Sequence, residues 1–191
     1  MDHLVISTNK TLRYSLLLFL YFIQGFPVGV FFLTIPAWLA ENKMDVTDIG
    51  YFSLMTTLPW TLKFINGFIL DRFVYLPMGR RRAWLLGAFL WIILVLLIYG
   101  TIAPNPTQLS LLATFSLLVM LGTAVQDTAI DAMAADLVQE EELSMANGLM
   151  FGGQIIGVAT GTATIGYTIT HFGFSVGMYA LAGVVGLAVL V

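Results

Sequence analysis

The sequence contains no cysteine and few charged residues. None of its 191 residues is Cys, and only 10% are Asp, Glu, Lys or Arg, whereas a soluble domain has about 25%. Without cysteine, disulfides and thiolate metal sites are excluded. The chain also lacks a basic stripe with interleaved aromatics, a glycine-rich phosphate loop and a His-Glu-x-x-His motif. The sequence therefore gives no support for nucleic-acid binding, a cofactor or a metal centre. His171 is a lone histidine in a loop without other metal-ligating residues nearby, so it does not indicate a metal site.

Apolar residues are abundant instead, at 59% of the chain. A water-soluble fold of this length cannot cover so much apolar surface, so lipid is the expected solvent. A helix needs about 20 mostly apolar residues to cross the hydrocarbon core, and an open sheet cannot satisfy its backbone there. The sequence predicts an all-α integral membrane protein with a single domain over 1–191. Its six expected transmembrane helices cover residues 12–39, 47–70, 83–102, 107–137, 144–170 and 174–191.

Basic residues set the expected orientation. Lys and Arg gather on the cytoplasmic side of membrane proteins. Only Lys43 lies in a loop on the opposite side from most of the basic residues. The N-terminus is therefore predicted to be cytoplasmic. The basic residues on that side are Lys10, Arg13, Arg72, Arg80, Arg81 and Arg82.

The loop between the second and third apolar runs combines glycine, an acid and arginines. Its pattern resembles the loop signature of the major facilitator superfamily, Gly-x-x-x-Asp-Arg-x-Gly-Arg-Arg, with additional residues at 74–78. The resemblance implies a cytoplasmic gate in which the acid and the arginines pair with neighbouring helix ends. A plain positive anchor is the alternative, but it explains only the arginines. The implied gate residues are Gly67, Asp71, Arg72, Gly79, Arg80, Arg81 and Arg82.

Two further motifs narrow the resemblance. Residues 58–64 (Leu-Pro-Trp-Thr-Leu-Lys-Phe) and 126–132 (Gln-Asp-x-x-x-Asp-Ala) are similar to the group of muropeptide permeases, acetyl-coenzyme A transporters and folate–biopterin transporters. This resemblance implies the N-terminal half of a 12-helix fold, with solute held between two six-helix halves and moved by alternating access. The last apolar run stops at Val191 without a polar flank, so we expect the C-terminal half to be missing from this chain.

The fourth apolar run carries acids inside the expected membrane. Asp127 and Asp131 are four residues apart and share one helix face, and Gln126 lies beside them. Intramembrane acids are costly and usually mark a cavity, an ion pair or a proton path. These three residues are predicted to line a substrate or proton pathway. The alternative is a structural ion pair that only locks helices together.

Helix depth brings Lys63 to the level of Asp127. Lys63 lies eight residues before Asp71, and Asp127 lies nine before Asp136, near the expected cytoplasmic ends. At about 1.5 Å per residue, both lie about 12–14 Å above those ends. We therefore predict a buried Lys63–Asp127 pair, either direct or bridged. The same counting places Asp136 beside Arg72 and the loop arginines, as a further member of the gate.

The first apolar run combines proline and glycine with polar residues. Residues 24–29 read Gln-Gly-Phe-Pro-Val-Gly. Proline removes a helical hydrogen bond and glycine weakens the helix, so a bend is expected here. Because broken helices near the midplane often border a transporter's substrate site, Tyr21 and Gln24 are predicted to line the cavity. An ordinary packed proline kink is the alternative.

The fifth apolar run carries glycines four residues apart. Small residues at this spacing let helix backbones approach closely. Packing within the chain is predicted, with a dimer face as the alternative. The glycines are Gly148, Gly152, Gly153, Gly157 and Gly161.

Together these features predict secondary active transport of a small amphiphilic or anionic solute, coupled to protons through Asp127 or Asp131. The expected partners are the lipid bilayer, the solute, protons and a C-terminal six-helix half. A bacterial inner membrane is the expected location. Two alternatives stay open: an intramembrane enzyme that uses the paired aspartates as acid and base, and an inactive or structural fragment.

Overall fold

The computed structural model describes residues 9–73 and 81–190. Within these two ranges most residues are helical and no strand occurs, which agrees with the predicted all-α class. Gly79 and Arg80 of the loop motif lie outside the described residues, as do the additional residues 74–78.

The first apolar run forms one long rod from three joined segments. α1 (Lys10–Gly29) leads into a π-helical turn (Val30–Thr34), which leads into α2 (Ile35–Glu41). The α-helix continues through Pro27, and the wider turn follows directly after Gly29. The irregularity therefore lies just beyond the predicted bend. Single π turns within α-helices are frequent at functional sites.

The second apolar run is broken in two. α3 (Val46–Thr61) and α4 (Lys63–Arg72) are separated by Leu62, whose backbone leaves the helical conformation with φ −95° and ψ 7°. Pro59 lacks an amide hydrogen, which weakens the last turn of α3. The predicted continuous helix over 47–70 is therefore wrong at this point, and the break makes Lys63 the first residue of α4.

The remaining runs form four helices and two short turns. Within residues 9–73 and 81–190, four helical stretches are long and apolar enough to cross a membrane: Lys10–Glu41, Arg82–Ile102, Leu109–Leu137 and Glu140–Phe172. All six predicted runs are helical, but length and composition support only four of them as complete spans. The elements are α5 (Arg82–Ile102), α6 (Leu109–Leu137), a 3-10 turn (Glu140–Glu142), α7 (Leu143–Phe172), α8 (Phe174–Leu187) and a last 3-10 turn (Ala188–Leu190).

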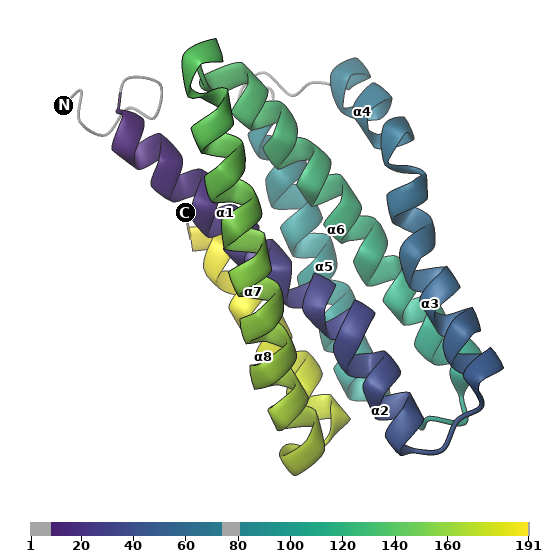
Figure 1. Ribbon diagram of the computed structural model, residues 1–191. Helices are drawn as coiled ribbons and strands as arrows, with labels where there is room; N and C mark the ends of the chain where they lie inside the picture. The colour runs from purple at the N-terminus through teal and green to yellow at the C-terminus, as the bar shows by residue number, and fades with distance from the viewer. Residues whose placement is uncertain (1–8, 74–80, 191) are drawn as a thin grey trace.

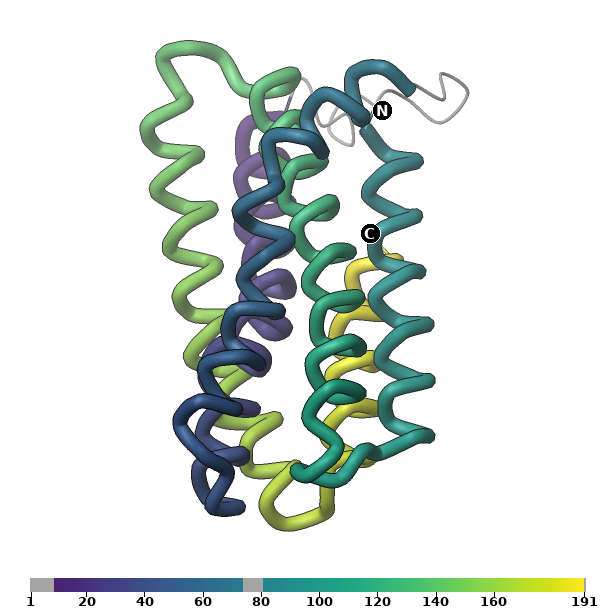
Figure 2. Tube along the Cα trace, turned by 90° about the vertical axis from the view of Figure 1, so that its right-hand side faces the viewer, coloured from purple at the N-terminus to yellow at the C-terminus, as the bar shows by residue number. Residues whose placement is uncertain are grey.

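The helices pack side by side, as Figures 1 and 2 show. α1 contacts α7, α6 and α8, and α6 contacts α5, α3 and α4. Phe31, Phe52 and Ile92 are completely buried in the apolar core between these helices. This arrangement leaves α3 and α4 on one side of α1 and α6, and α7 on the other (Figure 1). The face between these two sides carries the candidate site.

Glycines bring α7 against α1. A Cβ at Gly157 would lie 2.0 Å from the carbonyl oxygen of Phe22, and one at Gly161 would lie 2.7 Å from the Cα of Phe26. Gly153 approaches the first helix in the same way. For these three glycines, the predicted packing within the chain is present.

Gly148 and Gly152 take no part in this contact. A Cβ at either position would meet no heavy atom of the described residues within 4 Å. The predicted packing role is therefore wrong for these two within this chain. The reason is helical phase. One residue turns the helix by about 100°, so the step from Gly152 to Gly153 leads from the open side of α7 to the side that faces α1.

Candidate transport site

A lysine and two aspartates meet between α4 and α6. The Lys63 ammonium forms ion pairs with the carboxylates of Asp127 and Asp131, the second at 2.8 Å. The pairing predicted from helix depth is therefore present. The sequence argument treated Asp127 as the partner, whereas the structure has both aspartates sharing one lysine.

The two aspartates differ in exposure and in their other partners. The Asp127 side chain is 4% exposed and accepts a hydrogen bond from the Gln24 amide. The Asp131 side chain is 44% exposed and accepts a hydrogen bond from the Tyr21 hydroxyl. Asp127 is thus an inner counter-ion, whereas Asp131 and the half-exposed Lys63 reach the surface of the cavity.

The cluster carries an excess of negative charge. One ammonium and two carboxylates give +1 − 2 = −1 when all three groups are ionised. An uncompensated charge among transmembrane helices is costly. Uptake of one proton by either carboxylate would make the cluster neutral.

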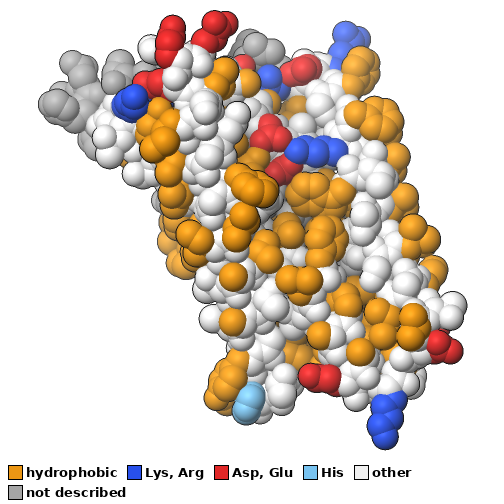
Figure 3. All heavy atoms as spheres, in the orientation of Figure 1, with side chains coloured by type: hydrophobic (Ala, Val, Ile, Leu, Met, Phe, Trp, Pro, Cys, Tyr) orange, Lys and Arg blue, Asp and Glu red, His pale blue; other side chains and the backbone are white. Residues whose placement is uncertain are grey.

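These side chains line a pocket of about 280 Å³. Figure 3 shows charged side chains grouped among apolar ones on this face of the molecule. The lining of the pocket also includes Trp60, which the sequence used only as part of a family motif, and Asn147 and Gln154, which it did not single out. The Gln154 amide donates to the side-chain oxygen of Gln24 at 3.3 Å and so links α7 to the cluster. The available signal was the position of Gln154 between Gly153 and Gly157, on the side of α7 that packs on α1.

Gln126 does not join the cluster. Its side chain is 1% exposed, and its amide nitrogen has no hydrogen-bond partner among residues 9–73 and 81–190. It lies one residue before Asp127 and therefore about 100° around α6. The structure buries Gln126 in helix packing and does not bring it to the pocket.

Arg81 joins the ends of α4 and α6. Its guanidinium lies 2.7 Å from the Asp71 carboxylate and 3.1 Å from that of Asp136. Desolvation opposes the charge, but hydrogen bonds to these two acids raise the pKa of Arg81 above its ordinary value. Asp136 was expected beside Arg72 and the loop arginines, and Arg81 is the arginine that it contacts; Arg72 is exposed and forms no ion pair within the described ranges. A Cβ at Gly67 would touch nothing described within 4 Å, so no close contact here requires glycine.

Comparison with known proteins decides the family. A family profile described as Major Facilitator Superfamily matches residues 17–191. The chain belongs to the major facilitator superfamily. The relatives of this chain that carry a functional name include a permease and a putative transporter. Membership of the superfamily therefore favours transport over the alternative of an intramembrane enzyme.

Three relatives are about one-third identical in sequence to this chain. The anhydromuropeptide permease of Escherichia coli K12 is 32% identical over 130 residues, which cover 68% of this chain and 26% of the permease. A putative AmpG transporter of Rickettsia bellii is 31% identical over 141 residues (71% and 34%). An uncharacterized membrane protein of Saccharomyces cerevisiae is 34% identical over 158 residues (71% and 28%). The chain thus spans about a third or less of the length of these relatives.

A second cluster of ion pairs links the start of α1 to the start of α7. Glu142, just before α7, pairs with Arg13 and also with Lys10 at 3.3 Å. The Arg13 side chain is 4% exposed, so this pair is largely removed from water. The sequence argument used these basic residues only for orientation. Opposite charges at the neighbouring ends of the first and fifth runs were the available signal.

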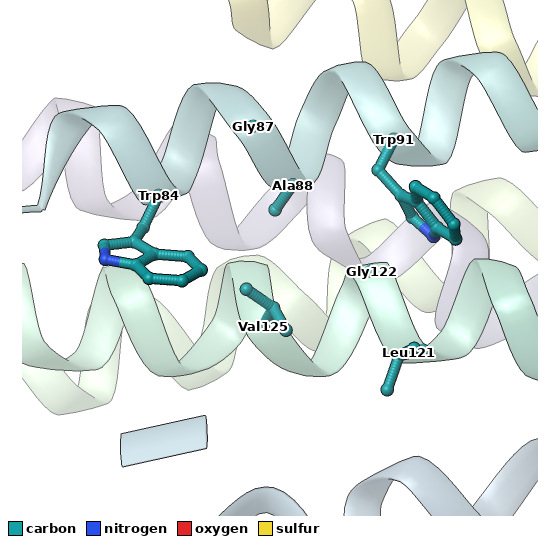
Figure 4. Close-up of a pocket in the computed structure, with 7 residues that line it drawn as sticks. All are labelled: Trp84, Gly87, Ala88, Trp91, Leu121, Gly122 and Val125. Atoms are coloured by element: carbon teal, nitrogen blue, oxygen red, sulfur yellow. The ribbon is translucent and has the colours of Figure 1, made fainter. Parts of the chain in front are cut away.

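An apolar groove lies between α5 and α6. Figure 4 shows Trp84 and Trp91 flanking it from α5, with Leu121 and Val125 on α6. Both indole N–H groups donate to backbone carbonyls, at 2.6 and 2.9 Å. The described lining carries no ionisable side chain, so this groove offers no chemistry for holding a charged solute.

Proposed function

We propose that this chain is the N-terminal six-helix half of a proton-coupled secondary transporter. The observation that carries the proposal is the cluster of Lys63, Asp127 and Asp131 in a pocket on a bundle of apolar helices. Superfamily membership supports transport by alternating access. A second six-helix half would cover the pocket face and enclose the solute. The proposed location is a bacterial inner membrane, with the N-terminus cytoplasmic.

Asp131 is the proposed proton site. An exchangeable proton must be reachable from the cavity, and Asp131 is 44% exposed whereas Asp127 is 4% exposed. Protonation of Asp127 would remove the buried counter-ion of Lys63. Protonation of Asp131 leaves that pair intact and removes the excess negative charge. Asp127 then serves as a fixed counter-ion, held in place by Gln24.

Protonation of Asp131 would also free one side of the Lys63 ammonium. That ammonium is now shared between two carboxylates. With Asp131 neutral, it has room for a carboxylate or phosphate of the solute. Proton and anion would then each strengthen the binding of the other, as linkage requires. This chemistry selects an anionic or amphiphilic solute, and the name of the E. coli relative makes an anhydromuropeptide the first one to test.

Asparagine at position 131 should uncouple transport. The amide cannot take up a proton, so accumulation of an anhydromuropeptide driven by a pH gradient should be abolished in proteoliposomes of the full-length protein. Exchange of solute without a gradient should continue. Asp48→Asn changes an acid in the first turn of α3, far along the chain from the cluster, and should accumulate solute normally. Full accumulation by Asp131→Asn would reject the proton site.

The proposed cytoplasmic gate centres on Arg81. The guanidinium bridges the end of α4 to the end of α6, so separating these ends must break at least one of its two ion pairs. Closure of the cytoplasmic side is therefore expected to depend on Arg81 more than on Arg72. The proposed gate comprises Gly67, Asp71, Arg72, Gly79, Arg80, Arg81, Arg82 and Asp136.

Labelling of a single cysteine tests this gate. The chain has no native cysteine, so Asn147→Cys places one reporter in the pocket. Arg81→Gln should raise the rate of its labelling from the cytoplasmic side about fivefold, because exposed ion pairs contribute up to about 1 kcal/mol. Arg72→Gln is the comparison within the gate and should raise the rate less, because Arg72 forms no ion pair among the described residues. Equal effects of the two substitutions would mean that the Arg81 pairs do not hold the gate.

A further inference from the structure

An apolar pocket adjoins the pocket at Lys63. Trp60 and Gln154 line both, so the two pockets are neighbours on one face, and we call the two together the groove. The second part has a volume of about 300 Å³. From Tyr21 at the polar end to Phe32 at the apolar end, the groove follows the first helix for about 16 Å at the helical rise per residue. The apolar part is otherwise lined by Val28, Phe32, Ile155 and Val158.

The two ends of this groove differ in chemistry. Lys63 and Asp131 supply charge at one end, whereas the described lining of the other end has no ionisable side chain. Figure 3 shows the same contrast, with charged side chains on this face bordered by apolar ones. A small polar anion would satisfy only the first end. The apolar walls of the second end would then have no group of the solute to pack against.

Trp60 stands between the two ends. The Lys63 ammonium lies 5.8 Å from the centre of its indole ring, and the Phe32 ring lies 6.4 Å away. The buried indole N–H of Trp60 has no hydrogen-bond partner in the described parts of the chain. Trp60 thus offers an aromatic face to an apolar group of the solute.

We propose that the groove binds an amphiphilic carboxylate along its length. The carboxylate lies at the Lys63 ammonium, and the aromatic or aliphatic body lies between Phe32 and Ile155. Trp60 is the shared wall that selects for both parts. The polar end of this inference rests on the proposed function, whereas the apolar end does not.

Two carboxylates that differ only in their apolar part test the inference. N-acetylglycine and N-benzoylglycine carry the same carboxylate and amide, but a methyl group in one is a phenyl ring in the other. Binding to the full chain in lipid nanodiscs is measured by calorimetry, with empty nanodiscs as the control for partitioning. N-benzoylglycine should bind about tenfold more tightly, which corresponds to 1.4 kcal/mol.

Two adjacent isoleucines provide matched variants. Ile155 lines the apolar end, whereas Ile156 does not, and their exposures are similar at 53% and 59%. Ile155→Asn should reduce the preference for N-benzoylglycine to threefold or less, and Ile156→Asn should leave it unchanged. Equal affinity of the two probes, equal effects of the two substitutions, or no measurable binding of N-benzoylglycine would overturn the inference.

A further variant separates this inference from the proposed function. Lys63→Met combined with Asp127→Asn removes both members of the buried pair, so no unpaired charge is left there. Loss of binding of both probes would support the polar end. Unchanged binding of both probes would overturn the placement of the carboxylate and, with it, the role of Lys63 in transport. The benzoyl preference, measured in the parent protein and in Ile155→Asn, reports on the apolar end whichever result this variant gives.

Discussion

Replacing Lys63 with methionine is expected to lower the free energy of unfolding by about 3–5 kcal/mol. Methionine keeps an apolar side chain but removes the ammonium. The 4%-exposed carboxylate of Asp127 would then keep the hydrogen bond from Gln24 but lose its cationic partner. Loss of one member of a buried ion pair is costly because the other charge stays out of water. Thermal unfolding of the chain in detergent, followed by circular dichroism, measures the loss.

The second substitution in this experiment is Asp127→Asn. Added to Lys63→Met, it replaces the buried carboxylate with a neutral amide and should restore most of the lost stability. Asp131→Asn alone should change stability by less than about 1 kcal/mol, because its side chain is 44% exposed. If the single and double variants lose equal stability, the Lys63–Asp127 contact does not stabilise the fold.

A single methyl group on Gly157 is expected to have a comparable effect through packing alone. The added Cβ of Gly157→Ala would lie 2.0 Å from the carbonyl oxygen of Phe22, which belongs to the backbone and cannot rotate away. The first helix and α7 must then move apart along their whole contact. We expect the free energy of unfolding to fall by about 3 kcal/mol or more, at the upper end of the range for overpacking.

Gly148→Ala is the matched control on the same helix. A Cβ at Gly148 meets no described atom within 4 Å, and alanine is favoured over glycine in a helix interior by about 0.5–1 kcal/mol. This variant should therefore be slightly more stable than the parent chain. Opposite signs for the two glycines in thermal unfolding are the expected result, and destabilisation of equal size at both would contradict the packing of α7 on α1.

Helix depth carried the sequence argument furthest. Counting residues from Asp71 and Asp136 placed Lys63 and Asp127 at one level, and the two side chains are paired in the structure. This worked because helical rise is nearly constant and the two helices are neighbours. The same counting placed Asp136 beside Arg72 and the loop arginines, and of these Arg81 is the one that pairs with Asp136 in the described residues. The helical rise gives the depth of a residue along its helix, but it does not predict which arginine of the loop contacts Asp136.

Rotation about the helix axis was harder to predict. The glycine spacing was correct for α7, but only one of its two phases faces α1. Gln126 lies next to Asp127 in sequence yet is buried away from the pocket, whereas Gln154 joins it. One residue turns the helix by about 100°, so neighbours in sequence can face different surroundings. As long as the neighbouring helices are unknown, the spacing of the glycines does not show which of the two rows faces another helix.

The break at Leu62 was also missed, because Pro59 lies in an otherwise uniform apolar run. Proline frequently occurs within transmembrane helices without ending them. The sequence therefore predicts a weak point but not whether the helix resumes at once or after a break. Here α4 resumes at Lys63, and the ammonium of that residue is directed toward both aspartates of α6.

Infrared difference spectroscopy tests the central claim most directly, namely that Asp131 takes the proton while Lys63 stays paired with Asp127. Spectra of the full chain in membranes are recorded before and after acidification, for the parent protein and for Asp131→Asn. The account predicts a protonated-carboxyl band in the parent protein that is lost in Asp131→Asn. Persistence of that band in Asp131→Asn, together with its loss in Asp127→Asn, would contradict the account and assign the proton to the buried aspartate.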